Sequence, residues 1–270
     1  MVKLKVLVPT SYTWRPGQHV FLRIPSLSLL DNHPFTIASA PSPSSENANT
    51  IALFVRPHNG FTSKLHSHAV SQPDLSLSAH LDGPYGGCSR RIENVYDSIV
   101  LVSGGSGITP SLAWLAYLAP RMAAGSVTTT SVRLIWVVRK RAHLEWVHDE
   151  LDLVSATMPK NCFVTDIHVT NDDSEPRGSS SKESGEGSPA ITTKTSLTAT
   201  QRSSSEISRG RPVLAELIAQ ALAPGTRTCV FGCGPESMKI DLSNAVAGAQ
   251  QRVLKGDLKE VRLETETFGW

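Results

Sequence analysis

The chain has 270 residues, 40% of them hydrophobic, which is enough for two modest domains that each bury a core. A formal net charge of +2, without a run of Lys and Arg, argues against nucleic-acid binding. The four cysteines form no CxxC pair, no apolar run is long enough for a bilayer, and no signal peptide precedes "KLKVLVP", so we expect a soluble, cytoplasmic protein.

Residues 1–96 predict short antiparallel strands separated by turns. The strands are expected in "KLKVLVP", "QHVFLRIP", "PFTIAS", "NTIALFVRP" and "LSLSAHLDGPYGG". A short helix is expected in "GFTSKLHSHA", before the last of them. This pattern is typical of an antiparallel β-barrel covered by one helix.

Residues 97–270 predict a second domain, in which strands alternate with helices. Strands are expected in "SIVLVS", "SVRLIWVVRK", "NCFVTDIHVT" and "TRTCVFGCGP". Helices are expected in "SLAWLAYLAPRM", "HLEWVHDELDLVSA", "VLAELIAQALA" and "ESMKIDLSNAVAGAQQRVL". Such alternation is typical of an α/β domain whose parallel sheet is covered on both faces.

One stretch of the second domain, residues 171–210, is rich in Ser, Thr, Gly and charge. Its apolar surface is too small to offset the entropy of ordering, so we expect a disordered insertion. A spacer is the favoured interpretation, and a partner-binding or phosphorylated segment is the alternative.

The Gly-rich turn "GGSGITP" joins the first strand of the α/β domain to its first helix. Glycines there let the backbone approach a pyrophosphate, and the helix N-terminus supplies free N–H groups. Thr109 is expected to cap the helix and Pro110 to stand in its first turn. The alternative is a tight turn that binds nothing. The candidate cofactor-binding residues are Gly104, Gly105, Ser106, Gly107, Ile108, Thr109 and Pro110.

Arg139 stands at the end of the next strand, where an acidic residue would favour NAD and an arginine would accommodate the 2′-phosphate of NADP. We therefore predict NADPH rather than NADH as the nucleotide. For the neighbouring Lys140 and Arg141, a solvated basic loop remains a competing interpretation.

The segment "FGCGPESM" places Cys233 between two glycines at the end of a later strand. A lone cysteine is usually a buried structural thiol, but the glycines suggest that something flat approaches closely. Gly232, Cys233, Gly234 and Pro235 are therefore candidate cofactor-binding residues. No residue is assigned to a metal, because His66 and His68 have no partners of the right type nearby in the sequence.

With these pieces assembled, the chain resembles the flavin and nicotinamide half of fungal ferric reductases, relatives of the NADPH oxidases within the ferredoxin-reductase-like group. The matching stretches, in family order, are "WRPGQHVFLRIP", "HPFTIASAP", "VRPHNGFTSKL", "DGPYGG", "LVSGGSGITP", "FGCGPESM" and "TFGW". The resemblance implies a two-domain fold, with an FAD-binding β-barrel followed by an NADPH-binding α/β domain.

The resemblance also implies which residues bind FAD. It places the strand around Phe35 along the flavin, Arg56 on the pyrophosphate, and Gly60 before a short helix whose dipole assists. Tyr85 is expected to support the cofactor from the region between the domains. The residues implied are His33, Pro34, Phe35, Thr36, Ile37, Ser39, Arg56, Gly60, Phe61, Thr62, Gly83 and Tyr85.

For catalysis, the resemblance places Cys233 beside the nicotinamide and a C-terminal aromatic residue over the flavin ring. Phe268 and Trp270 are both candidates for that aromatic residue, and packing of a C-terminal tail is the alternative for each.

The implied reaction is hydride transfer from NADPH to FAD, followed by release of single electrons. In the family the electrons pass to haems in a membrane domain, which this chain lacks, so the acceptor is expected to be a ferric chelate or a separate haem domain. An NADPH oxidase module that yields superoxide, or a truncated nucleotide-binding fragment without turnover, are the alternatives. The oligomeric state is left open.

Overall fold

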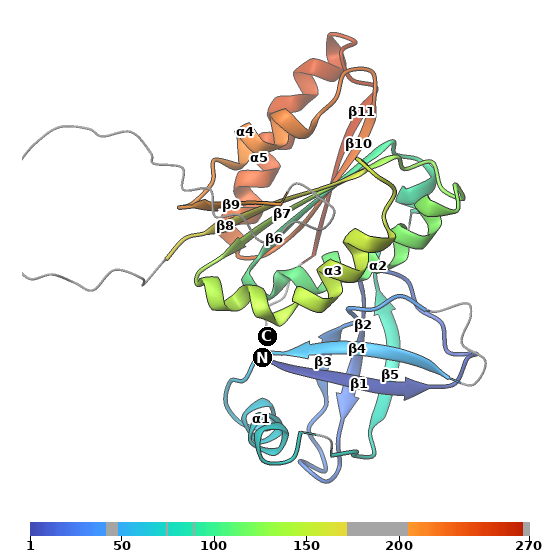
Figure 1. The fold of residues 1–270 in the computed structure, drawn as a ribbon, viewed down its shortest axis with the longest axis vertical. Helices are drawn as coiled ribbons and strands as arrows, with labels where there is room; N and C mark the ends of the chain where they lie inside the picture. Colours follow the sequence, from blue (N-terminus) through green and yellow to red (C-terminus); the bar gives the residue numbers. More distant parts are fainter. Residues whose placement is uncertain (42–47, 74, 89, 172–204, 267–270) are drawn as a thin grey trace, which may run out of the picture.

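The computed structural model of the chain describes residues 1–41, 48–73, 75–88, 90–171 and 205–266 (Figure 1). The Ser/Thr-rich residues 172–204 and the aromatic residues Phe268 and Trp270 lie outside this part. None of the helices within the described ranges is long and apolar enough to cross a membrane.

The first half of the described chain is an antiparallel β structure covered by one helix. Its elements are β1 (Val2–Val8), β2 (Gln18–Arg23), β3 (His33–Thr36), β4 (Asn49–Val55), α1 (Phe61–Ser71) and β5 (His80–Gly86). β1 pairs with β4, β2 pairs with both β3 and β5, and the bridge between Ile37 and Leu53 joins the two sheets. Alternate residues of β2 and β4, among them Val20, Leu22, Ile51 and Leu53, are fully buried, and Phe61 and Leu65 of α1 complete this core.

The second half is an α/β domain with its helices on both faces of a sheet. Its main elements are β6 (Ser98–Gly104), α2 (Ile108–Ala123), β7 (Ser131–Val138), α3 (His148–Thr157), β8 (Phe163–Val169), β9 (Ser205–Arg209), α4 (Leu214–Ala221), β10 (Arg227–Cys233), α5 (Glu236–Leu254) and β11 (Glu260–Glu266). Three short 3₁₀ helices are η1 (Ile92–Asn94), η2 (Gly105–Gly107) and η3 (Arg141–Trp146).

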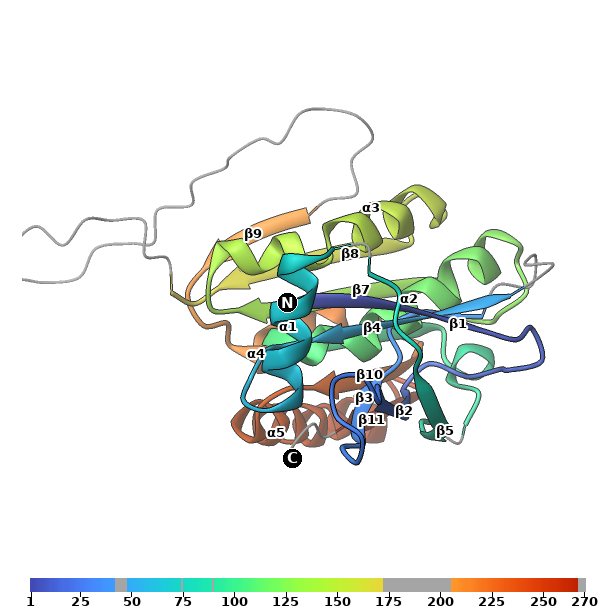
Figure 2. The ribbon, with the colours of Figure 1, turned by 90° about the horizontal axis from the view of Figure 1, so that it is seen from below.

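Within the described residues, the six strands of this sheet are all parallel and lie in the order β11-β10-β6-β7-β8-β9. Figure 2 shows that order from β9 at the top to β11 at the bottom. Ile99 and Leu101 of β6 pack on the side of α2 and α3, whereas Val100 and Val102 pack on the side of α4 and α5. Burial on both faces explains why β6 is a continuous apolar run.

Two strands differ from the sequence-based expectation. β9 falls inside residues 171–210, which were expected to be disordered, and that expectation is wrong for residues 205–209 because they add a parallel edge strand to β8. β11 was not predicted, because Glu260, Glu264 and Glu266 interrupt its apolar residues. The domain boundary placed at residue 96 stays a prediction.

The two halves pack directly against each other. Ala38 and Phe54 of the barrel belong to the same apolar cluster as the buried residues of α2 and α3. Beside Phe54, its cross-strand neighbour Lys3 of β1 forms an ion pair with Glu150 of α3. The predicted two-domain arrangement is therefore confirmed, and a site between the halves has one wall from each.

Candidate functional site

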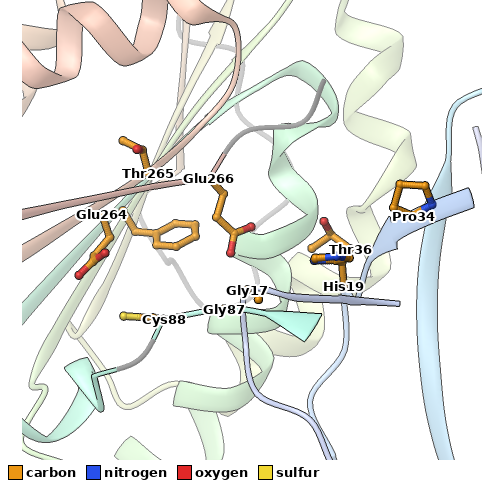
Figure 3. Close-up of a pocket in the computed structure, with 11 residues that line it drawn as sticks. Gly17, His19, Pro34, Thr36, Gly87, Cys88, Glu264, Thr265 and Glu266 are labelled. Atoms are coloured by element: carbon orange, nitrogen blue, oxygen red, sulfur yellow. The ribbon is translucent and has the colours of Figure 1, made fainter. Parts of the chain in front are cut away.

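A cavity of about 360 Å³ lies between the barrel and the ends of β10 and β11 (Figure 3). It is lined by residues from both halves: Gly17, His19, Pro34, Thr36, Gly86, Gly87, Cys88, Phe231, Glu264, Thr265 and Glu266. The lining combines glycine backbone, the apolar side chains of Pro34 and Phe231, and polar side chains from both halves. A cavity of this size is typical of a small-molecule or cofactor site.

Two walls of the cavity face each other closely. Gly17 has a φ of 83°, and a Cβ atom built on it would lie 2.6 Å from Oε1 of Glu266. Figure 3 shows the Glu266 carboxyl pointing from the end of β11 toward Gly17 and Thr36. Only glycine fits this turn, because a side chain would be strained and would also collide with the carboxyl.

Glu266 is the most perturbed carboxyl of the cavity. Burial raises its pKa to about 8. The side chain is therefore mainly neutral at pH 7, and it can donate a hydrogen bond as well as accept one. A carboxyl with such a pKa in a cleft is a candidate functional group.

Replacing Glu266 with Gln should flatten the pH dependence of stability. The folded protein holds a proton at Glu266 up to a pKa of about 8, whereas the unfolded chain releases it near its ordinary value of 4.5. The free energy of unfolding should therefore fall between these pH values, by at most about 1.4 kcal/mol per pH unit. Melting temperatures of the FAD-free proteins from pH 5 to 9 measure this slope. Glu264→Gln is the matched control, and an unchanged slope in Glu266→Gln would refute the assignment.

The predicted FAD strand β3 divides its side chains between two faces. Pro34 and Thr36 line the cavity, and their binding of FAD stays a prediction. Phe35 instead packs against the barrel core, and His33 stacks on Phe61 at 4.7 Å between ring centroids. Successive side chains of a strand point to opposite faces, which explains this split. Phe35 was expected to form an apolar wall, but it does not line the cavity.

Arg56 and the start of α1 form a separate group suited to an anion. Arg56 is exposed directly after β4, and the first turn of α1 has no acidic residue and no side-chain cap. The Thr62 hydroxyl folds the preceding turn by accepting the N–H of His58 at 2.9 Å, so the free donors are backbone groups. Nearby, Nε2 of His33 is buried without a hydrogen-bond partner among the described residues. Free N–H groups, a positive helix end and an arginine fit a pyrophosphate.

The two Gly-rich turns predicted from the sequence meet in the structure. A Cβ on Gly104 would lie 2.7 Å from Pro235, and one on Gly234 would lie 3.1 Å from the Gly104 nitrogen. Both turns are followed by helices, α2 and α5, without side-chain caps. The carboxyl ends of β6 and β10 therefore present adjacent helix N-termini, which suits a dinucleotide.

Cys233 lies within this contact and has no exposed surface. Burial raises the pKa of its thiol, and the negative potential of Glu266 adds to that effect. The sulfur belongs to the apolar core beside Gly107 and does not line the cavity. A catalytic role for Cys233 stays a prediction. Any such role would belong to a thiol that is neutral and buried.

Arg139 is exposed immediately after β7, as the NADPH prediction requires. Burial lowers the pKa of the nearby His143, and Arg56, Lys140 and Arg139 lower it further. The positive potential at His143 therefore has contributions from the barrel and from the end of β7.

Other predicted residues are placed away from the cavity. Ile37, Phe61 and Ile108 are core residues, and the Ser39 hydroxyl donates to the Thr50 carbonyl. Thr109 does not cap α2, because the helix begins at Ile108 and the Thr109 hydroxyl donates to the Ser106 carbonyl at 3.0 Å. 

Tyr85 is 45% exposed, and its hydroxyl donates to Asp82 at 2.7 Å. It lies beside the cavity, with its ring 6.1 Å from that of His19. Gly83 precedes the cis bond to Pro84 in the same strand and is not a cavity residue.

Several cavity residues were not predicted from the sequence. Gly17 and His19 belong to "RPGQH", which was recognised as a motif without a role being assigned to its residues. Glu266 could have been found only by recognising β11 and its pairing beside Cys233. Among the described residues, no group of three or more His, Cys, Asp or Glu could hold a metal ion.

Two protein-family models match the chain. The model described as "Ferric reductase NAD binding domain" matches residues 96–247, and that described as "FAD-binding domain" matches residues 1–89. The predicted FAD and nicotinamide cofactors are confirmed at the level of these domains.

The curated relatives that the chain matches include ferric reductases. A probable cell surface ferric reductase of Aspergillus oryzae is 27% identical over 98% of this chain and 49% of that protein. The ferric/cupric reductase transmembrane component 7 of Saccharomyces cerevisiae is 27% identical over 95% of this chain and 44% of that protein. The chain therefore spans about half the length of the curated relatives it matches.

A solved structure shares the fold. The CS-b5R domains of human Ncb5or, in the NAD+ form, match 96% of this chain and 64% of that chain with a TM-score of 0.60 and 15% identity. This likeness confirms the predicted ferredoxin-reductase-like architecture.

Proposed function

The chain belongs to the ferric reductase NAD-binding family, and from this premise we propose that it transfers a hydride from NADPH to FAD and passes electrons on to an acceptor. The observation that carries the proposal is the cavity that joins the barrel to the ends of β10 and β11. Its walls come from the domain that matches FAD binding and from the sheet of the nicotinamide-binding domain. Two rings can meet only at such a junction.

The residues of the chain fit FAD. The buried, unpartnered Nε2 of His33, the uncapped start of α1 and Arg56 are suited to the pyrophosphate. The Thr36 hydroxyl and the neutral Glu266 carboxyl are suited to the polar edge of the flavin, from opposite walls. Bound FAD would supply the two-electron to one-electron conversion, and the protein would orient the rings and exclude water.

On the nucleotide side, the paired Gly-rich turns would hold the pyrophosphate of NADPH, and Arg139 its 2′-phosphate. Gly107 and Cys233 pack together beneath this position and leave the end of β10 flat. The acceptor is proposed to be a ferric chelate or a haem domain, by analogy with the named activities of the relatives. The oligomeric state is not part of the proposal.

Anaerobic mixing of the FAD-loaded protein with NADPH tests the proposal. The yellow flavin absorbance should bleach, and ferricyanide should then restore it. Bound flavin that stays yellow would favour a nucleotide-binding module without turnover. Superoxide as the main product in air would favour an oxidase module instead. A protein that stays colourless in excess FAD would overturn the proposal.

Replacing Arg139 with Ala should raise the KM for NADPH by about 10-fold and leave the KM for NADH within about twofold, because only NADPH carries the 2′-phosphate. Steady-state reduction of ferricyanide with each nucleotide measures both values. NADH serves as the internal control. An equal rise for the two nucleotides would assign Arg139 to a general structural role.

A further inference from the structure

A buried carboxylate, Glu93, lies at the junction of the two halves. It belongs to η1, the first helical turn after the barrel, and its side chain is 1% exposed. Burial of a charged group costs free energy unless the charge is paired. The partners of Glu93 therefore indicate what this carboxylate does at the junction.

Glu93 is held firmly by the α/β domain. Its main-chain oxygen accepts the N–H groups of Thr128 and Thr129 at 3.0 and 3.1 Å. Its Oε1 accepts the hydroxyl of Tyr117, on α2, at 3.3 Å. The Arg121 guanidinium lies 3.6 Å from the centre of the Tyr117 ring and fixes that ring in turn. The carboxylate is thus part of the same rigid body as the sheet.

The charged partner of Glu93 comes from the barrel. Nη2 of Arg15 lies 3.5 Å from Oε1 of Glu93, whereas Oε2 is buried without a hydrogen-bond partner among the described residues. Arg15 therefore reaches across the junction to a buried carboxylate of the other half. The contact joins the domains by charge rather than by apolar packing.

Arg15 also starts the turn that forms one wall of the cavity. The Gln18 side chain accepts the Arg15 N–H at 2.7 Å, and the Gln18 N–H donates to the Arg15 carbonyl at 3.2 Å. Gly17 stands inside this turn and faces Glu266. Gln18 is further tied to the carbonyl of Gly86, another cavity residue, at 3.3 Å.

We propose that Arg15 and Glu93 are positioning residues that set the separation between the Gly17 turn and the end of β11. Glu93 is fixed to the domain that carries β11, and Arg15 is fixed to the turn, so the ion pair holds the turn toward the end of β11, in addition to the apolar contacts and the Lys3–Glu150 pair that join the halves. The inference rests on the proposed hydride transfer, for which that separation would control the contact of flavin and nicotinamide.

The test compares Arg15→Ala, Arg15→Lys and the double variant Arg15→Ala/Glu93→Gln, in which no buried charge is left unpaired. Asp166→Asn is the matched control, because Asp166 pairs with Arg133 at 2.5 Å within the sheet, where it is 14% exposed. Stopped-flow mixing with NADPH measures the rate of flavin reduction, and titrations measure the affinities for FAD and NADPH.

Arg15→Ala and the double variant should reduce the flavin about 10- to 100-fold more slowly, with FAD affinity and the KM for NADPH within about threefold of wild type. Arg15→Lys should restore much of the rate, and Asp166→Asn should leave it unchanged. Rates within twofold of wild type in both Arg15→Ala proteins, or a loss explained fully by weaker FAD binding, would overturn the proposal.

Hydrogen exchange separates this proposal from the proposed function. Without FAD, the single Arg15→Ala variant and the double variant should both exchange amide hydrogens faster than wild type at residues 15–18 and 264–266. Asp166→Asn should exchange at the wild-type rate in both segments. Faster exchange in a protein that NADPH fails to reduce would support the positioning role while refuting the reaction. Unchanged exchange at both walls would refute the positioning role itself.

Discussion

Gly107→Ala is expected to lower the rate of NADPH-dependent flavin reduction by about 100-fold, since displacement of catalytic groups by roughly an ångström has effects of this size. A Cβ at this position would lie 2.3 Å from the carbonyl oxygen of Cys233 and 2.8 Å from its carbonyl carbon. These are main-chain atoms, so no side chain can rotate away. The start of α2 and the end of β10 would have to separate.

The same substitution should cost about 1–3 kcal/mol of stability, as overpacking usually does. Thermal unfolding and stopped-flow reduction measure the two effects. Gly248→Ala is the matched control: Gly248 lies within α5, and a Cβ there would meet nothing within 4 Å. That control should gain about 0.5–1 kcal/mol, because alanine favours a helix. Equal rates in the two variants would refute the importance of the contact between the turns.

Arg56→Ala should yield protein that is largely free of flavin after purification. A charge-assisted hydrogen bond contributes about 1.5–3 kcal/mol, so loss of a bidentate partner should weaken FAD binding by about 100-fold or more. The absorbance ratio of flavin to protein measures occupancy, and titration of the FAD-free variant measures affinity.

Arg227→Ala is the matched control for Arg56→Ala. Arg227 is also exposed, but it stands at the amino end of β10, away from the strand ends that form the sites. The Arg227→Ala variant should retain its full content of flavin. Full yellow occupancy of Arg56→Ala would remove Arg56 from the cofactor site and leave the start of α1 and Nε2 of His33 to support the pyrophosphate assignment.

The sequence predicted those features that depend on local patterns. The apolar run of β6, the amphipathic α5 and the glycines between β6 and α2 each reflect a neighbourhood of a few residues, and all were found where expected. The contact of that turn with the Cys233 segment was not predicted, although the carboxyl ends of parallel strands do lie at one edge of a sheet.

Features that depend on distant partners could not be predicted. The direction of Phe35 depends on which face of β3 meets the barrel core, and an apolar residue suits either face. Ser39 resembles a ligand-binding hydroxyl until the Thr50 carbonyl is seen to accept its proton. Glu266 and Glu93 look like surface carboxylates in the sequence, and only the packing of the halves buries them.

The order of strands separates the part of the chain that can vary in length from the part that must keep its shape. The cavity lies at the β11 edge, whereas the chain leaves the described sheet after β8 and returns at β9, the opposite edge. Three strands, β10, β6 and β7, stand between β11 and β8. Evolution can therefore lengthen or shorten the β8–β9 connection without moving the walls between which the electrons would pass.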